Sequence, residues 1–290
     1  AIVWPQGQVC PHCGCMGRIA ALNGVKDKKG RERLGLKKCY DCRKQFTVRV
    51  GTIFERSHLP LHVWFQAAYL MCSSKKGVSS NQLHRTLGVT LQTAWFMSHR
   101  LREAMRTGGL APMGGTGRTV EADETFIGRK YGSIVRRGHG HKNAVLSLVD
   151  RESGQVRSFH VDGTSAADIV PIIKANVANE TAMMTDEGGH YFTLGDHFAS
   201  HERVSHKADE YVRGDVHTNT VEGYFSIFKR GMKGVYQHCD EKHLHRYVSE
   251  FDFRYSNRAA CGCEDRERAN RALRGVAGKR IAYRESNATN

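Results

Sequence analysis

HTNTVEGYFSIFKR, residues 217–230, contains two side-chain patterns that predict different roles for one helix. Its apolar side chains recur at helical spacing, which predicts a helix with one face in a protein core. A second face carries polar side chains at steps of three, four and three, namely Asn219, Glu222, Ser226 and Lys229. Either this polar face is a solvated surface, with Asn219 and Glu222 forming a helix cap, or it presents a carboxylate and a cation to an active site.

The sequence before this helix alternates between expected strands and helices, which is typical of an α/β domain. Three strands are expected first, within residues 118–128, 142–150 and 155–161. The turn sequence RESG between the second and the third favours antiparallel pairing. The remaining elements are expected to be a helix at 165–178, a strand at 181–186, a helical turn within 189–200 and a weak strand at 202–206. The predicted order is therefore three strands, helix, strand, strand and long helix.

Two aspartates stand at positions where a ligand would meet such a sheet. Asp123 lies in the first expected strand, and Asp186 ends the fourth, just before a Gly-Gly pair. Ligands of open α/β sheets collect outside strand ends, so both carboxylates are expected at one site, with Glu222 of the long helix as the third. Three carboxylates without Cys or His ligands suit Mg²⁺ or Mn²⁺. The alternatives are a solvated acidic strand around Asp123 and a turn role for Asp186.

The glutamates on either side of Asp123 bear on this choice. Alternation along the strand is expected to turn Glu121 and Glu124 to the face opposite Asp123. Such an arrangement favours Asp123 as the member of the group that belongs to the site.

The first fifty residues contain two CxxC pairs, CPHC at 10–13 and CYDC at 39–42. Each pair offers two thiolates, and two such turns complete a tetrahedral Zn²⁺ site of the zinc-ribbon kind. The predicted ligands are Cys10, Cys13, Cys39 and Cys42. Nine cysteines, an odd number, favour a reducing compartment over a disulfide frame. The alternatives are a redox CxxC pair and exchange of a ligand with Cys15 or His12.

Residues 51–107 predict a helix-turn-helix region. VSSNQLHRTLGVTLQTAWFMSHRLREAM, residues 78–105, shows a short helix, a turn and a longer helix. Ser79 or Ser80 is expected to cap the first helix, Gly88 to end it, and Thr90 to cap the second. On this interpretation the DNA contacts are Gln92, Thr93, His99 and Arg100. An ordinary helical hairpin is the alternative.

The predicted domains are a zinc ribbon at 1–50, the helix-turn-helix region at 51–107, a flexible linker at 108–117, a catalytic domain at 118–260 and a charged, peripheral tail at 261–290. The 44 Lys and Arg residues outnumber the 29 Asp and Glu residues, which gives a formal charge of +15 and favours a nucleic-acid partner. A basic protein without such a partner is the alternative. No apolar run is long enough to span a bilayer and no signal peptide opens the chain, so no membrane partner is expected.

A basic loop joins the first two strands of the catalytic domain. GRKYGSIVRRGHGHK, residues 128–142, is rich in Gly, Arg and His and is expected to follow a DNA backbone. Its candidate DNA contacts are Arg129, Lys130, Arg136, Arg137 and Lys142. A solvated loop is the alternative.

The segments HTNTVEGYFSIFKRGMKGVYQH and HLHRYVSEFDFRYSNR, at 217–238 and 243–258, closely resemble the C-terminal signature of bacterial insertion-sequence transposases of the DDE type. The likeness extends from the CPHC pair to about Arg258 and includes the contexts of both aspartates. It resembles the subgroup that begins with a zinc ribbon. The fold that the resemblance implies is multidomain α/β: an RNase H-like mixed-sheet core preceded by a zinc ribbon and a helix-turn-helix.

The resemblance also implies an activity and its residues. Asp123, Asp186 and Glu222 would be the catalytic acidic triad, with Asn219 as the other choice for the third position. Lys229 would be the basic residue further along the helix, and Lys229, Arg230 and Lys233 would contact DNA. Two Mg²⁺ or Mn²⁺ ions would serve each active site.

The expected activity is that of a DNA transposase that binds terminal inverted repeats, cleaves DNA at the element ends and joins the 3′-OH to target DNA. A homodimer or larger synaptic assembly on double-stranded DNA is expected, in the bacterial cytoplasm with the nucleoid. The alternatives are an RNase H-like nuclease without joining activity and a non-catalytic DNA-binding regulator.

Overall fold

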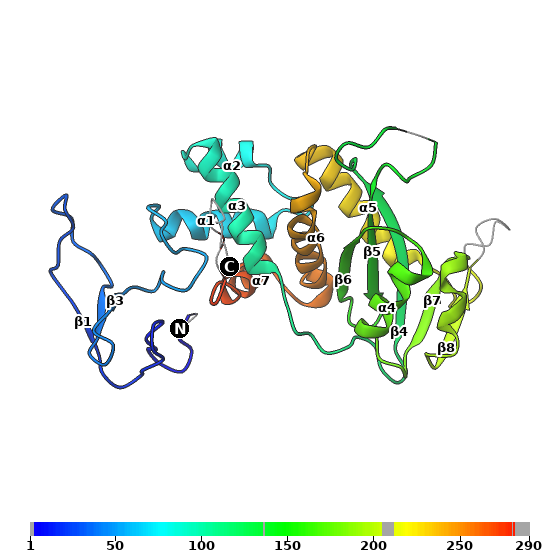
Figure 1. The fold of residues 1–290 in the computed structure, drawn as a ribbon, viewed down its shortest axis with the longest axis horizontal. Helices are drawn as coiled ribbons and strands as arrows, with labels where there is room; N and C mark the ends of the chain where they lie inside the picture. The colour runs from blue at the N-terminus through cyan, green and yellow to red at the C-terminus, as the bar shows by residue number, and fades with distance from the viewer. Residues whose placement is uncertain (1–2, 136, 205–211, 280, 282–290) are drawn as a thin grey trace.

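The computed structural model describes residues 3–135, 137–204, 212–279 and 281. Figure 1 shows three parts in a row: a small sheet near the N-terminus, a group of helices, and a larger α/β domain. Within the described residues, no helix has both the length and the apolar character needed to cross a membrane.

The N-terminal part is a three-stranded antiparallel sheet in the order β1 (Ile19–Ala21), β2 (Lys37–Cys39) and β3 (Gln45–Phe46). Its core consists of Cys10, Cys39 and Phe46, with Trp4 packed against them. A core of this size supplies little folding free energy by itself, so a bound metal would have to contribute much of it.

The helical part begins with α1 (Leu61–Ser73), α2 (Ser80–Leu87) and α3 (Leu91–Met105). The local signals predicted from sequence are confirmed here. Ser79 accepts the backbone N–H of Gln82, and Thr90 accepts that of Thr93. Gly88 ends α2 in the left-handed conformation, with φ at 64°. The helix, three-residue turn and helix therefore follow the predicted arrangement.

The predicted C-terminal tail is wrong for the residues described. Helix α7 (Asp265–Arg274) packs on α1 and α3, and its apolar side chains belong to the same core as Trp64 and Leu101. Arg268 is buried and donates to the carbonyl oxygens of Cys72 and Cys263. The helical core is thus built from two segments on opposite sides of the α/β domain in sequence. Residues 280 and 282–290 lie outside the described part.

The predicted linker at 108–117 is not free either. Met113 is buried and forms a bridge with Val177: its N–H donates to Asn176 O, and its carbonyl accepts from the N–H of Ala178. This contact fixes the segment to the end of α4 (Ala166–Asn176). The sequence gives no signal of it, because the partner lies more than sixty positions away.

The α/β domain contains a five-stranded mixed sheet in the order β6-β5-β4-β7-β8. Strands β4 (Thr119–Ile127), β5 (Asn143–Asp150) and β6 (Val156–Val161) pair antiparallel. Strands β7 (Ala182–Thr185) and β8 (Ser200–Arg203) continue the sheet parallel to β4. The short 3₁₀ helix η1 (Gly189–Leu194) joins them. This is the RNase H-like arrangement, and the predicted order of elements is confirmed.

Helices cover both faces of this sheet (Figure 1). One face packs against α4 and η1 through Val120, Ala122 and their neighbours. The other packs against α5 (Asn219–Gly231), the π-helix η3 (Met232–Tyr236) and α6 (Glu241–Ser256). The short η4 (Ala259–Cys261) follows α6. Even-numbered residues of β4 therefore face α4, and odd-numbered ones, such as Ile127, face α5 and α6.

A buried charge network joins the helical part to the α/β domain. Arg102 of α3 and Glu250 of α6 are fully buried, and Arg102 Nε lies 2.7 Å from Glu250 Oε2. Arg254 and Tyr236 donate to the other oxygen of the same carboxylate at 2.6 Å each. The guanidinium of Arg102 also lies 3.9 Å from the ring centroid of Tyr247. These contacts fix α3 against the α/β domain.

Candidate active site

Asp123 and Asp186 occupy equivalent positions on two neighbouring parallel strands. Ala122 of β4 pairs with Thr185, the last residue of β7; Asp123 follows Ala122 within β4, and Asp186 is the residue directly after β7. The parallel register thus places the two side by side at the centre of the sheet. Asp186 Oδ1 accepts the backbone N–H of Gly188 at 2.8 Å, which closes the turn that leaves β7.

The environment of Asp123 makes its negative charge unfavourable. Burial raises the pKa of this carboxyl to about 8, helped by the negative charges of Glu124, Asp186 and Glu222. Both other members of the predicted triad therefore act electrostatically on Asp123. Its side chain accepts the backbone N–H of Glu124 at 2.7 Å.

Glu222 lies in the first turn of α5, on the helix that packs against the Asp123 face of the sheet. Its carboxylate is exposed and accepts from the hydroxyl of Thr218 at 3.1 Å. Asn219 is the first residue of α5 and is also exposed. Lys229 lies two turns further along, with Nζ 5.8 Å from the ring centroid of Phe225. Arg230 and Lys233 are exposed beyond it.

Glu121 was missed as a functional candidate, and its predicted orientation is wrong. A strand alternates with a period of two, so Glu121 shares the face of Asp123, and only Glu124 points the other way. Glu121 is fully buried and accepts from Thr220 Oγ1 and Val221 N at 2.8 Å each, at the start of α5. Its spacing of two from Asp123 was the signal that would have found it.

Glu124 faces η1 on the opposite side of the sheet. One carboxylate oxygen, Oε1, accepts from the hydroxyl of Tyr191 and lies 3.0 Å from His190 Nε2. The hydrogen bond to Glu124 raises the pKa of His190. His190 and Tyr191 follow Asp186 by four and five residues, so Glu124 connects β4 to the segment that leaves Asp186.

The donor set of this site suits a hard divalent cation. It offers carboxylate oxygens without a thiolate, at a position where a positive charge would offset the cost of ionising Asp123. Among the described residues, three ligand atoms within 4.8 Å of one another occur at cysteine-containing clusters and not at these acids. The carboxylates are thus neighbours that a cation would draw together.

The raised pKa of Asp123 leads to a pH-dependent stability. The folded protein holds this proton more tightly than the unfolded chain. The stabilisation that protonated Asp123 gives to the fold is therefore complete below about pH 4, and it is lost as pH rises towards 8. Without added Mg²⁺, Asp123→Asn should remove this loss and raise the free energy of unfolding at pH 8 by at least about 1 kcal/mol. Urea denaturation at pH 5 and pH 8 measures it, with the exposed Asp196→Asn as control. An unchanged pH slope in Asp123→Asn would contradict the assignment.

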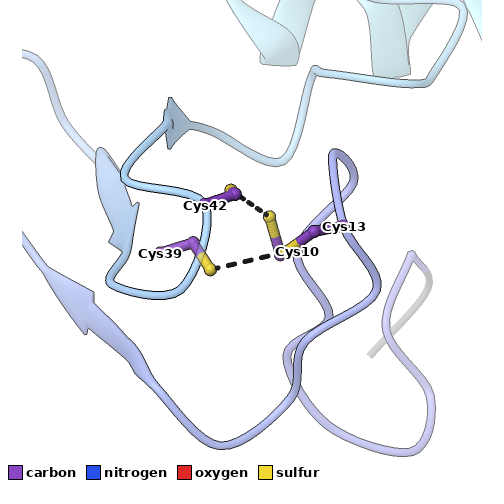
Figure 2. A group of neighbouring side chains, drawn as sticks. All are labelled: Cys10, Cys13, Cys39 and Cys42. Carbon is purple, nitrogen blue, oxygen red and sulfur yellow. Dashed lines mark hydrogen bonds between the residues drawn. The ribbon is translucent and has the colours of Figure 1, made fainter.

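The four predicted zinc ligands form a compact cluster, drawn in Figure 2. Sγ of Cys10 lies 3.6 Å from that of Cys42, and Sγ of Cys13 lies 3.7 Å from that of Cys39. Tetrahedral zinc with bonds of about 2.3 Å requires S···S separations of about 3.8 Å, so the cluster fits Zn²⁺. Cys15 and His12 are not members of this four-sulfur group; Cys15 instead lies near Cys39 and Asp41.

Removing zinc should unfold the ribbon and leave the five-stranded sheet intact. The metal would supply much of the folding free energy of residues 10–42, because their apolar core is so small. A chelator, or Cys39→Ser, should abolish amide-exchange protection in the ribbon while β4 and β5 stay protected, as mass spectrometry can measure. Cys261→Ser, outside the cluster, is the matched control. Unchanged protection of residues 10–42 would refute the structural role of the metal.

Two of the predicted DNA contacts on α3 are wrong for this structure. His99 is 1% exposed, and burial lowers its pKa to about 2, so it offers no charge to a phosphate. Arg100 is 6% exposed and donates to the carbonyl oxygens of Ile53 and Glu55. Gln92 is exposed and Thr93 half-buried, both near the start of α3. The sequence pattern did not reveal the contacts that bury His99 and Arg100: the rings of His243 and Tyr247 on α6 lie against His99, and the segment before α1 accepts from Arg100.

The basic loop between β4 and β5 places its cations on the surface. Arg129 donates to Ser133 O, and Lys130 donates to Asp162 O at 2.7 Å, so both are held in place. Arg137 is exposed and Lys142 half-buried. The predicted contact at Arg136 lies outside the described residues.

Comparison with known proteins gives two family matches. Residues 114–256 match the family model described as the ISXO2-like transposase domain, and residues 1–45 match the transposase zinc-ribbon domain. An uncharacterized protein in transposable element ISH50 of Halobacterium salinarum is 27% identical over 270 residues, covering 87% of each chain.

Solved structures show only a distant likeness. A chain of the simian T-cell lymphotropic virus intasome, in complex with PP2A regulatory subunit B56 gamma, is 12% identical with a TM-score of 0.30. The match covers 59% of this chain and 63% of that one. A chain of the Mos1 strand transfer complex is 14% identical with a TM-score of 0.23, over 72% and 81% of the two chains. Scores this low support no argument about the site.

The zinc-ribbon match covers the four clustered cysteines. The transposase-domain match covers the mixed sheet with its two adjacent aspartates. The chain belongs to the zinc-ribbon insertion-sequence transposases with a DDE-type domain.

Proposed function

We propose that the protein binds the ends of an insertion sequence, cleaves DNA there and joins the freed 3′-OH to target DNA. The observation that supports this most is the parallel register of β4 and β7, which sets Asp123 beside Asp186, together with the negative charge of Glu222 acting on Asp123. Ionising Asp123 beside the other two carboxylates costs free energy in the absence of a cation, and a site that binds divalent metal and phosphate would account for keeping these acids together.

In this proposal Asp123, Asp186 and Glu222 hold Mg²⁺ or Mn²⁺. When bound, such cations would supply activation of the attacking oxygen and stabilisation of the leaving oxygen in an in-line displacement. Glu222 is preferred to Asn219 as the third residue, because a carboxylate binds a divalent cation more strongly than an amide, and because its charge is one of those acting on Asp123. Asn219 would assist from beside it.

The chain's own residues then position the substrate. Lys229, on the same helix as Glu222, would hold a phosphate next to the scissile one. The first step uses water as the nucleophile and releases a 3′-OH at the element end. In the second step that hydroxyl attacks a target phosphodiester, forms the new bond and releases the target's own 3′-OH. No covalent link to the enzyme is needed, because each step is a direct displacement at phosphorus.

DNA recognition is assigned to surfaces outside this site. The exposed start of α3, with Gln92 and Thr93, would meet the terminal repeat, together with the zinc ribbon. The basic loop and the end of α5 would follow the backbone of double-stranded DNA; their described cations are Arg129, Lys130, Arg137, Lys142, Arg230 and Lys233. The net charge of +15 agrees with a polyanionic partner.

Strand exchange requires two element ends at once, so we expect a homodimer or larger synaptic assembly acting on chromosomal DNA within the cell. The two rival functions are a nuclease that cuts without joining and a regulator that only binds DNA. A strand-transfer assay with labelled end DNA, supercoiled target and Mg²⁺ separates them. Joined products support the proposal, cut products alone favour the nuclease, and a shifted but intact substrate favours the regulator.

A further inference from the structure

The sequence EADE at 121–124 places a buried carboxylate on each side of the catalytic candidate Asp123. Glu121 is 0% exposed and the side chain of Glu124 is 8% exposed. Buried carboxylates are costly unless several donors satisfy them, so a chain retains them where their hydrogen bonds have a use. Neither glutamate belongs to the proposed metal-binding triad, yet each is fully engaged with a different element.

Glu121 connects β4 to the beginning of α5. Its two oxygens accept from Thr220 Oγ1 and from the N–H of Val221, at 2.8 Å each. The N–H of Val221 is one of the donors that a helix leaves unpaired in its first turn, so Glu121 acts as a cap supplied by another element. Glu222, the proposed metal ligand of α5, is the very next residue.

Arg151 strengthens this connection from the turn after β5. Its Nε donates to Glu121 Oε1 at 2.5 Å. The same guanidinium donates to the carbonyl oxygens of Asp215 and His217, at 2.7 and 2.5 Å. The segment leading into α5 is therefore bound to β4 through a buried ion pair and not only through apolar packing.

Glu124 makes the corresponding connection to η1 on the other face of the sheet. Oε1 accepts from the hydroxyl of Tyr191 and lies 3.0 Å from His190 Nε2. The turn between Asp186 and this pair is tight: a Cβ at Gly188 would come within 2.7 Å of His190 and 2.9 Å of Asp186. Fixing His190 thus restrains the turn that presents Asp186.

We propose that Glu121 and Glu124 are positioning residues, each of which fixes to β4 the element that presents one of the other two acidic side chains. The inference rests on the proposed function, because it assumes that the triad holds a divalent cation. In it, the EADE segment sets the spacing of the whole site: Asp123 belongs to the triad, Glu121 locates Glu222, and Glu124 locates the turn after Asp186.

The test is Mn²⁺ binding to the full-length, zinc-loaded protein, followed by electron paramagnetic resonance. Loss of a residue that orients metal ligands typically weakens affinity about 10–100-fold. Glu121→Gln and Glu124→Gln should each weaken Mn²⁺ binding at least about 10-fold, and Glu180→Gln, an exposed residue just before β7, should not change it. Urea denaturation without Mn²⁺ is measured in parallel. A merely structural role would lower stability and leave the Mn²⁺ affinity of the folded protein unchanged, which would overturn the inference.

Milder variants keep the test decisive if the glutamine variants do not fold. Thr220→Val removes one donor to Glu121, and Tyr191→Phe removes one donor to Glu124. Both should weaken Mn²⁺ binding by about 2–5-fold, because one hydrogen bond to a charged group is lost. Wild-type affinity in both would overturn the inference.

The failure of the proposed function is distinguishable from this one. If Asp123→Asn binds Mn²⁺ as tightly as the wild type, the metal site itself is wrong, and the positioning roles fall with it. If Mn²⁺ binds at the triad but the strand-transfer assay yields no cut or joined DNA, the proposed function fails while the positioning roles are still decided by the affinities.

Discussion

Asp186→Asn should abolish DNA cleavage and joining, with a loss of at least about 10³-fold in rate, while DNA binding stays within about twofold of the wild type. Divalent cations contribute several kcal/mol to stabilising the charge of a phosphoryl-transfer transition state, and each 1.36 kcal/mol is a factor of about ten. The amide keeps the shape of the side chain and its acceptor for the N–H of Gly188, which the aspartate receives at 2.8 Å. Only the negative charge is removed.

The measurement compares cleavage in Mg²⁺ with binding to end DNA in the absence of divalent cations. Asp196→Asn is the control, since Asp196 is exposed and follows η1 by two residues. Parallel loss of binding and cleavage in Asp186→Asn would show that Asp186 maintains the fold. Full cleavage by the variant would remove it from the catalytic set.

The second large effect is expected at the junction of the helical and catalytic parts. Glu250→Gln should lower the free energy of unfolding by about 3–5 kcal/mol, because it leaves the buried guanidiniums of Arg102 and Arg254 without their counter-charge. Glutamine also replaces one accepting oxygen with an NH2 donor; Arg102 already donates to one of these oxygens, and Arg254 and Tyr236 donate to the other. Urea denaturation followed by circular dichroism measures the loss.

Glu267→Gln on α7 is the matched control. Its carboxylate pairs with Arg271 and Arg274, but all three side chains are between 39% and 62% exposed, so the expected change is below about 1 kcal/mol. Glu250→Gln should also separate the melting of the helical part from that of the sheet. A variant as stable as the wild type would mean that the buried network contributes specificity and little stability.

Local signals in the sequence predicted the elements well because they act over a few residues. The caps at Ser79 and Thr90 and the glycine stop at Gly88 need only their own turn to work. The two CxxC pairs predicted the sulfur cluster for a similar reason, since each pair forms its own tight turn. The positions of Asp123 and Asp186 on adjacent strands follow from the order of elements alone.

Long-range packing set the limit of prediction. The burial of His99 depends on α6, whose His243 and Tyr247 rings lie against it about 150 residues away, and Arg100 is bound to the carbonyl oxygens of Ile53 and Glu55 about 45 residues before it. The charged segment at 265–276 looked peripheral, although Ala269, Ala272, Leu273 and Val276 recur at the spacing of a buried helix face. The prediction misplaced Glu121 because it misread the alternation along the strand, although the sequence signal was present. For Met113 the sequence contains no such signal, because a bridge to a distant residue leaves no local pattern.

The pairing of α7 with α1 has a consequence for biosynthesis. Two backbone hydrogen bonds join the segment before α1 to the segment after α7: the N–H of Ile53 donates to Val276 O, and the N–H of Gly278 donates to Gly51 O. During translation, the apolar face of the first three helices therefore stays exposed to solvent until the ribosome has added more than 150 further residues. A prematurely terminated chain would then lack a completed helical part and, on the proposed function, would compete poorly with the full-length protein for the element's ends.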